Sequence, residues 1–202
     1  MKANLLGILK LICFLLLLPF IYCVCFSFST QVMAIGQPKS LWLCYGAGIF
    51  IACYLFVYNF QEVYALGQRI VAQLLAFAKP VADAASVVLP IYTILLSVAF
   101  LILNNMKLLG NFEEAAVMAL SFSWMMHVVL TAFQLNDGEK AVIKGGYFLS
   151  FGASLVVCVL IAALLLALLF PEFSIGHFIQ HLSNHTTSLY HSIYKTLFVP
   201  PA

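Results

Sequence analysis

The chain has 202 residues, of which 64% are hydrophobic and only 8% are charged, and its mean hydropathy is +1.09. This composition lies far outside that of soluble domains and predicts an all-α integral membrane protein, because long apolar runs satisfy their backbone internally as helices. The net charge of +2 is scattered along the chain without a basic run, which excludes nucleic acid as an expected partner.

Five stretches are long and apolar enough to cross a bilayer as helices. They are residues 5–28, 41–60, 84–103, 115–133 and 147–170. The first follows Lys2 and contains Lys10, as a signal peptide does, but its apolar run is too long for one, so we expect a retained signal-anchor. The third carries Pro90, which membrane helices tolerate better than soluble helices do. Residues 1–172 are therefore predicted to form one polytopic domain in the lipid bilayer.

The six cysteines all lie inside apolar runs, whereas a disulfide framework or a zinc site would place them in polar loops. We interpret them as small buried hydrophobic side chains and expect no cofactor. They are Cys13, Cys23, Cys25, Cys44, Cys53 and Cys158.

The positions of lysine and arginine predict an orientation, because cytoplasmic loops retain positive residues. Five spans divide the basic residues into a group of six and a group of three. The six are Lys2, Lys10, Arg69, Lys79, Lys140 and Lys144, and the three are Lys39, Lys107 and Lys195. The N-terminus is therefore predicted to be cytoplasmic and the tail to lie outside, in what we expect to be a bacterial inner membrane. A re-entrant segment within residues 61–83 would invert this orientation.

Residues 173–202 form a tail with histidines at helical spacing. His177, His181, His185 and His191 fall within an arc of about 120° on a helix, and five apolar residues fall on the other side. These five are Phe178, Leu182, Leu189, Ile193 and Leu197. We predict an amphipathic helix whose apolar face lies on the membrane or on a partner. His177, His181 and His185 are also candidate metal ligands, but no Cys, Asp or Glu follows Glu172, which favours a plain polar face.

Two polar residues within or beside the spans are candidate catalytic groups. His127 lies inside the fourth span and Glu62 directly follows the second. An ionisable residue at membrane depth is a functional hypothesis by default, whereas a neutral imidazole bonded to a neighbouring helix is the simpler interpretation of His127. No paired carboxylates, phosphate-binding loop or Ser-His-Asp pattern accompanies them.

Two segments carry a resemblance to a known family: LPIYTILLSVAF from Leu89, and LSFSWMMHVVLTAFQLNDGEKAVIKGGYFLSF from Leu120. Through them, residues 45–170 resemble a bacterial group within the site-2-protease-like membrane metallopeptidases. Such enzymes carry HExxH on a membrane helix, where two histidines bind zinc and the glutamate is the general base. The matching stretch here is Gln61-Glu62-Val63-Tyr64-Ala65, which keeps only the glutamate. The position of the family's aspartate ligand is Ala141, with Asp137 nearby but offset, so the resemblance implies a pseudoenzyme that has lost its metal.

These observations together favour a non-enzymatic membrane subunit that acts as a scaffold or binds other membrane protein subunits. One alternative is a residual membrane-embedded metallopeptidase in which Glu62, His127 and either Asp137 or Glu139 assemble a site. Another is a transport or channel subunit, for which polar residues should line a path, yet His127 is the sole ionisable group well inside any predicted span.

Overall fold

The structure, a computed structural model, describes residues 2–56, 60–138 and 145–198, and all regular elements in these ranges are helical. The α-helices are α1 (Lys2–Ala34), α2 (Lys39–Phe56), α3 (Gln61–Leu74), α4 (Lys79–Val88), α5 (Ile91–Asn105), α6 (Glu113–Gly138), α7 (Gly145–Leu169) and α8 (Ile175–Phe198). Two short 3₁₀ turns, Ala76–Ala78 and Gly110–Phe112, lie between α3 and α4 and before α6.

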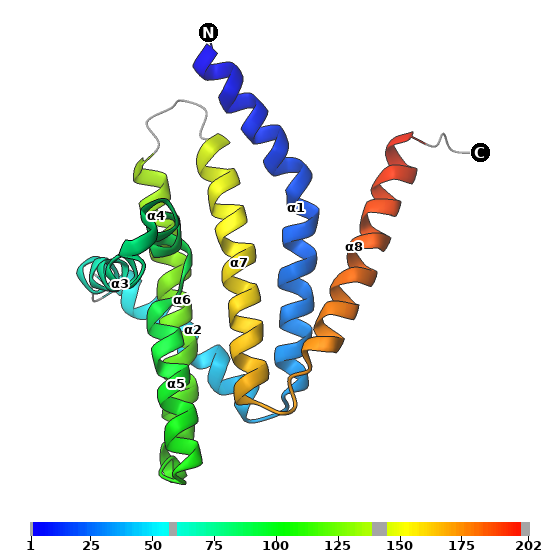
Figure 1. Cartoon of the computed structure of the whole chain (residues 1–202). Helices are drawn as coiled ribbons and strands as arrows, with labels where there is room; N and C mark the ends of the chain where they lie inside the picture. Colours follow the sequence, from blue (N-terminus) through cyan, green and yellow to red (C-terminus); the bar gives the residue numbers. More distant parts are fainter. Residues whose placement is uncertain (1, 57–59, 139–144, 199–202) are drawn as a thin grey trace.

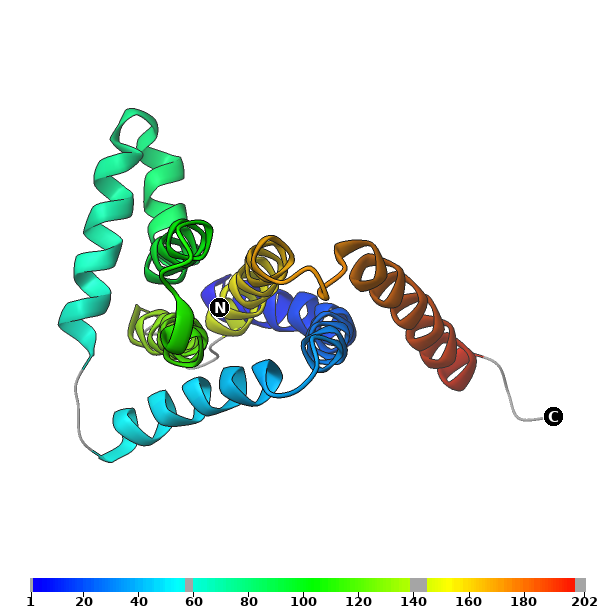
Figure 2. The same cartoon turned by 90° about the horizontal axis from the view of Figure 1, so that it is seen from below.

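Three long helices, α1, α6 and α7, lie with their axes roughly along one line, α6 antiparallel to the other two, and form the body of the molecule (Figure 1). α2 crosses obliquely and packs mainly on α6, whereas α1 packs mainly on α7. α5 runs beside the lower part of α6, and α3 and α4 form a hairpin that lies crosswise to the bundle, as the view from below shows (Figure 2).

Four helices within the described residues are long and apolar enough to cross a membrane. Their ranges are Leu5–Ala34, Lys39–Phe56, Glu113–Asp137 and Gly145–Leu169. They match the first, second, fourth and fifth predicted stretches, although residues 57–59 of the second lie outside the described residues. The all-α fold class is therefore confirmed, with long apolar helices compatible with a membrane.

The third predicted stretch, residues 84–103, is not one helix. α4 ends at Val88, α5 begins at Ile91, and Pro90 stands between them. Proline has no backbone N–H, and its ring clashes with the carbonyl four residues earlier, here that of Ser86. The 15 residues of α5 rise about 22 Å, which is short of a hydrocarbon core of about 30 Å.

Close helix crossings depend on two glycines. A side chain at Gly46 of α2 would overlap the Met118 carbonyl oxygen and the Ser121 hydroxyl of α6. A side chain at Gly145 of α7 would overlap the Gly7 carbonyl oxygen of α1. These small residues let the backbones of the chain's own helices approach closely, which is their common role between membrane helices.

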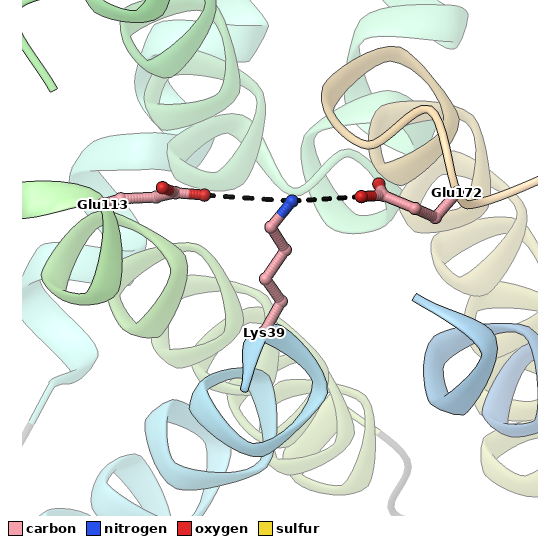
Figure 3. A network of polar contacts seen from close by, with 3 residues as sticks. All are labelled: Lys39, Glu113 and Glu172. Carbon is pink, nitrogen blue, oxygen red and sulfur yellow. Dashed lines mark hydrogen bonds and ion pairs between the residues drawn. The ribbon is translucent and has the colours of Figure 1, made fainter. Parts of the chain in front are cut away.

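A charged cluster joins three helix ends at the lower end of the bundle. The Lys39 ammonium, at the start of α2, lies between Glu113 at the start of α6 and Glu172 just after α7 (Figure 3). The Nζ atom is 3.3 Å from Glu172 Oε1, 4.0 Å from Glu113 Oε1 and 5.3 Å from the centre of the Phe170 ring.

The tail forms α8, which begins after the Ser174 hydroxyl accepts a hydrogen bond from the His177 amide at 3.3 Å. Serine is a preferred residue for capping a helix start in this way. α8 then runs back beside α1, from the lower end of the molecule toward the end that holds the N-terminus (Figure 1).

Candidate functional site

The break between α4 and α5 frees backbone carbonyl groups that polar side chains of α6 then bind. The imidazole of His127 lies with Nε2 3.2 Å from the Val88 carbonyl oxygen, which requires the tautomer that carries a proton on Nε2. His127 is 6% exposed. This contact matches the simpler interpretation of His127, a hydrogen bond to another helix, and the Thr131 hydroxyl of its own helix lies 3.5 Å from the same nitrogen.

Thr131, one turn after His127, binds the adjacent carbonyl. Its hydroxyl donates to the Val87 carbonyl oxygen at 3.2 Å and lies 2.8 Å from the Tyr64 hydroxyl of α3. Because the single hydroxyl proton of Thr131 is directed at Val87, the Tyr64 hydroxyl is the donor in the second bond. Burial raises the pKa of Tyr64, so its hydroxyl stays protonated at neutral pH. His127, Thr131 and Tyr64 thus hold the broken segment against α6 and α3, and we call them the break cluster.

Glu62 does not join the break cluster. It is exposed on α3, whereas Tyr64, two residues later, contacts His127 with ring centres 5.7 Å apart. Residues two apart leave a helix about 200° from each other, so Glu62 points away from the side that meets His127. Asp137 is exposed near the end of α6. Glu139 and Ala141, the other positions considered for a ligand or an acid, lie outside the described residues.

Among the described residues, no three or more His, Cys, Asp or Glu side chains come close enough together to hold a metal ion. The tail histidines do not form such a group. His181 and His185 lie side by side with ring centres 5.6 Å apart, but both are exposed, and His185 also meets the edge of the Phe26 ring of α1 at 5.0 Å. His177 and His191 are exposed on the same helix.

The predicted apolar face of α8 lies mostly on α1 of the same chain. Phe178 is 1% exposed, while Leu182, Leu189 and Ile193 are half-buried and Leu197 is 69% exposed. The sequence pattern alone predicts a membrane or a partner against this face. The chain's own α1 covers most of it, because the turn at residues 170–174 folds α8 back.

The polar side of α8 faces away from α1. Along the bundle, it lies level with the most apolar part of α1. The Tyr190 hydroxyl donates to the Leu16 carbonyl oxygen at 2.7 Å, and Leu16 lies near the middle of the apolar segment Leu5–Ala34. The exposed polar residues of α8 on this side, here called the polar face, are His177, Gln180, His181, Asn184, Thr187, Ser188, His191, Ser192 and Lys195.

Sequence reasoning missed Thr131, Tyr64 and the charged cluster around Lys39. The four-residue spacing of His127 and Thr131 was a usable signal, because it places both on one side of α6. The three helix ends that meet at Lys39 are far apart in sequence, so nothing local indicated them.

Comparison with known protein families, curated proteins and solved structures gives no match to this chain.

Proposed function

We propose that this chain is a non-enzymatic integral membrane subunit that binds another membrane protein through the polar face of α8. The observation that supports this proposal is the position of α8 beside the middle of α1. If α1 spans the bilayer, the polar face lies at hydrocarbon depth. Polar residues at that depth face protein or a water-filled cavity, because lipid tails offer them no hydrogen bonds.

The partner's chemistry follows from the residues of the polar face. Hydroxyl, amide and imidazole groups alternate along it, and Lys195 is its only Lys, Arg, Asp or Glu residue among the described residues of α8. Such a surface binds a helix with polar side chains at matching intervals, since interhelical hydrogen bonds contribute about 0.6–2 kcal/mol each within membranes. A bacterial inner membrane with a cytoplasmic N-terminus remains part of this proposal.

Site-specific photocrosslinking in intact membranes tests the proposal. A photoreactive residue at Ser188, on the polar face, should crosslink to one partner protein, and that partner should copurify in mild detergent in stoichiometric amount. The matched control is the same photoreactive residue at Leu164, an apolar exposed position of α7. The double substitution N184L/S188L should abolish copurification. A chain that purifies as a monomer and crosslinks equally from Ser188 and Leu164 would refute the proposal.

The relationship to site-2-protease-like metallopeptidases is a second part of the proposal, supported by the order of the segments quoted above. In this view the chain keeps the family fold and has lost its zinc. Elemental analysis of the purified protein should find no bound zinc. One zinc per chain that is lost on Glu62→Ala or His127→Ala would instead support the residual metallopeptidase.

A further inference from the structure

An apolar cavity of about 300 Å³ lies between the two main helix pairs of the bundle. Its walls come from α1, α2, α5, α6 and α7, and they include Leu43, Ala47, Trp124, Ala162 and Leu166. α1 packs on α7 and α2 packs on α6, while α1 and α2 barely meet, so the cavity fills the space between the pairs. Exposed lining residues, among them Met33 and Cys44, show that it opens to the outside.

Three of the hydroxyl groups in the cavity wall are already hydrogen-bonded. Thr93 bonds to Ser123 at 3.0 Å, Ser97 donates to the Thr93 carbonyl at 2.7 Å, and Ser121 donates to the Met118 carbonyl at 3.1 Å. The wall therefore offers hydrocarbon contacts almost alone. Apolar cavities of this kind stay dry, and one of about 150 Å³ binds benzene.

From this geometry we infer that a bilayer lipid inserts an acyl chain into the cavity. The inference rests on the membrane location proposed above, because the medium at an opening between apolar spans is then lipid hydrocarbon. An unfilled cavity leaves its wall atoms without contact partners, whereas an acyl chain restores those contacts.

A protein helix does not fit this space. A helix is about 10 Å across, so 300 Å³ would hold only about 4 Å of its length. A polar ligand would leave its own hydrogen-bonding groups unsatisfied against this wall. An acyl chain is thin, flexible and wholly apolar, and it is present at high concentration around the opening.

The bound chain stabilises the contact between the helix pairs. Any ligand that binds the folded state alone stabilises it by mass action. The α1–α7 pair and the α2–α6 pair then share a lipid chain as part of their common core. Delipidated protein should therefore unfold at a lower temperature than the same protein supplied with lipid.

Trp124 provides a direct probe of occupancy because it lines the cavity and the chain has only one other tryptophan, Trp42. In a Trp42→Phe parent, reconstituted into nanodiscs of phosphatidylcholine with brominated acyl chains, the Trp124 fluorescence should be strongly quenched relative to nanodiscs of unbrominated lipid. Ala162→Leu on α7 and Ala47→Leu on α2 each place a side chain in the cavity. Both should reduce the quenched fraction at least twofold.

Ala153→Leu is the matched control, since Ala153 is exposed on α7 and does not line the cavity. It should leave the quenching of Trp124 unchanged. Circular dichroism verifies that each variant folds. Because the two cavity variants change different helices, the test still stands if one of them does not fold.

Flotation of the reconstituted protein with lipid distinguishes a wrong membrane location from a wrong acyl-chain site. Protein that does not float with lipid refutes the membrane location, whereas floating protein with equal quenching in the parent and both cavity variants overturns the acyl-chain site.

Discussion

Thr131 contributes more to the break cluster than its small side chain suggests. One hydroxyl group both accepts from Tyr64 and donates to the Val87 carbonyl, and Thr131 is 2% exposed. Pro90 is tolerated in this apolar setting because side chains of a neighbouring helix satisfy the carbonyl groups that the break frees. Removing the hydroxyl therefore deprives the buried Tyr64 hydroxyl and the partly buried Val87 carbonyl of this partner.

Thr131→Val should lower the free energy of unfolding by about 1–3 kcal/mol, the usual cost of leaving a buried polar group unsatisfied. Valine keeps the shape of threonine, so the loss reports the hydroxyl. Thr30→Val is the control, because the Thr30 hydroxyl donates to the Phe26 carbonyl of its own helix and so does not hold a separate segment in place. Denaturation in detergent followed by circular dichroism measures both variants, and equal stability of the two would contradict a role for Thr131 at the break.

Glu172 links protonation to the stability of the lower end of the bundle. Its own backbone amide and the Lys39 ammonium hold the pKa of the Glu172 carboxyl below its usual value near 4.5. A carboxyl whose pKa is lower in the folded state contributes stability that is present above its unfolded pKa and is lost as the pH falls through the folded pKa.

Glu172→Gln should therefore lower the unfolding temperature at pH 7, and this loss should shrink as the pH falls below 4.5 and through the lower pKa that Glu172 has in the folded state. The expected loss at pH 7 is under about 1 kcal/mol, because Glu172 and Lys39 are partly exposed and water screens their attraction. Thermal unfolding of both proteins across this pH range measures the difference. Glu114→Gln serves as the control, since Glu114 is an exposed carboxylate in the first turn of α6. A loss that persists unchanged at pH 3.5 would contradict the ion-pair explanation.

Two glycines of α2 differ in what surrounds them. Gly46 faces the α6 backbone so closely that a Cβ atom would overlap Met118, whereas a Cβ atom at Gly48 has no neighbour within 4 Å. Among the described helices, the contact between α2 and α6 is the most extensive. The sequence predicts the length of α2, but it does not predict which of its glycines faces α6.

Gly46→Ala should destabilise the protein by about 1–3 kcal/mol, because the two helices must separate to admit the methyl group. Gly48→Ala should be neutral or stabilise it by up to about 1 kcal/mol, because alanine has the higher helix propensity. Unfolding of the two variants under identical detergent conditions compares them directly. A larger loss for Gly48→Ala than for Gly46→Ala would contradict the packing of α2 on α6.

The sequence predicted the helices where one property, a long apolar run, decides the outcome, as in α1 and α7. It predicted the structure less well where contacts with residues distant in the chain decide whether a helix continues or what covers it. Pro90 was noted as tolerable within a span, but whether the helix continues past it depends on whether His127 and Thr131, some 40 positions further along the chain, can bind the freed carbonyls. The amphipathic pattern of the tail was predicted, but the surface that covers its apolar side is set by the turn that folds α8 onto α1.

The direction of α8 changes the orientation argument for the whole molecule. Five predicted spans place Lys195 on the same side as Lys39 and Lys107. In the structure the last turn of α8, which carries Lys195, lies toward the end that holds the N-terminus (Figure 1). Moving Lys195 to the larger group of basic residues strengthens the charge bias that predicts a cytoplasmic N-terminus.

The same geometry predicts that the end of α8 and the start of α6 lie on opposite sides of the membrane. In intact cells, a membrane-impermeant maleimide should label a cysteine introduced by Glu114→Cys and reach one introduced by Lys195→Cys only after permeabilisation. The six native cysteines lie within helices, four of them partly or fully exposed, so labelling of the parent chain gives the background. If α8 instead lay flat on the outer surface, both positions would label in intact cells. That result would remove the polar face from hydrocarbon depth and, with it, the observation that supports partner binding through α8.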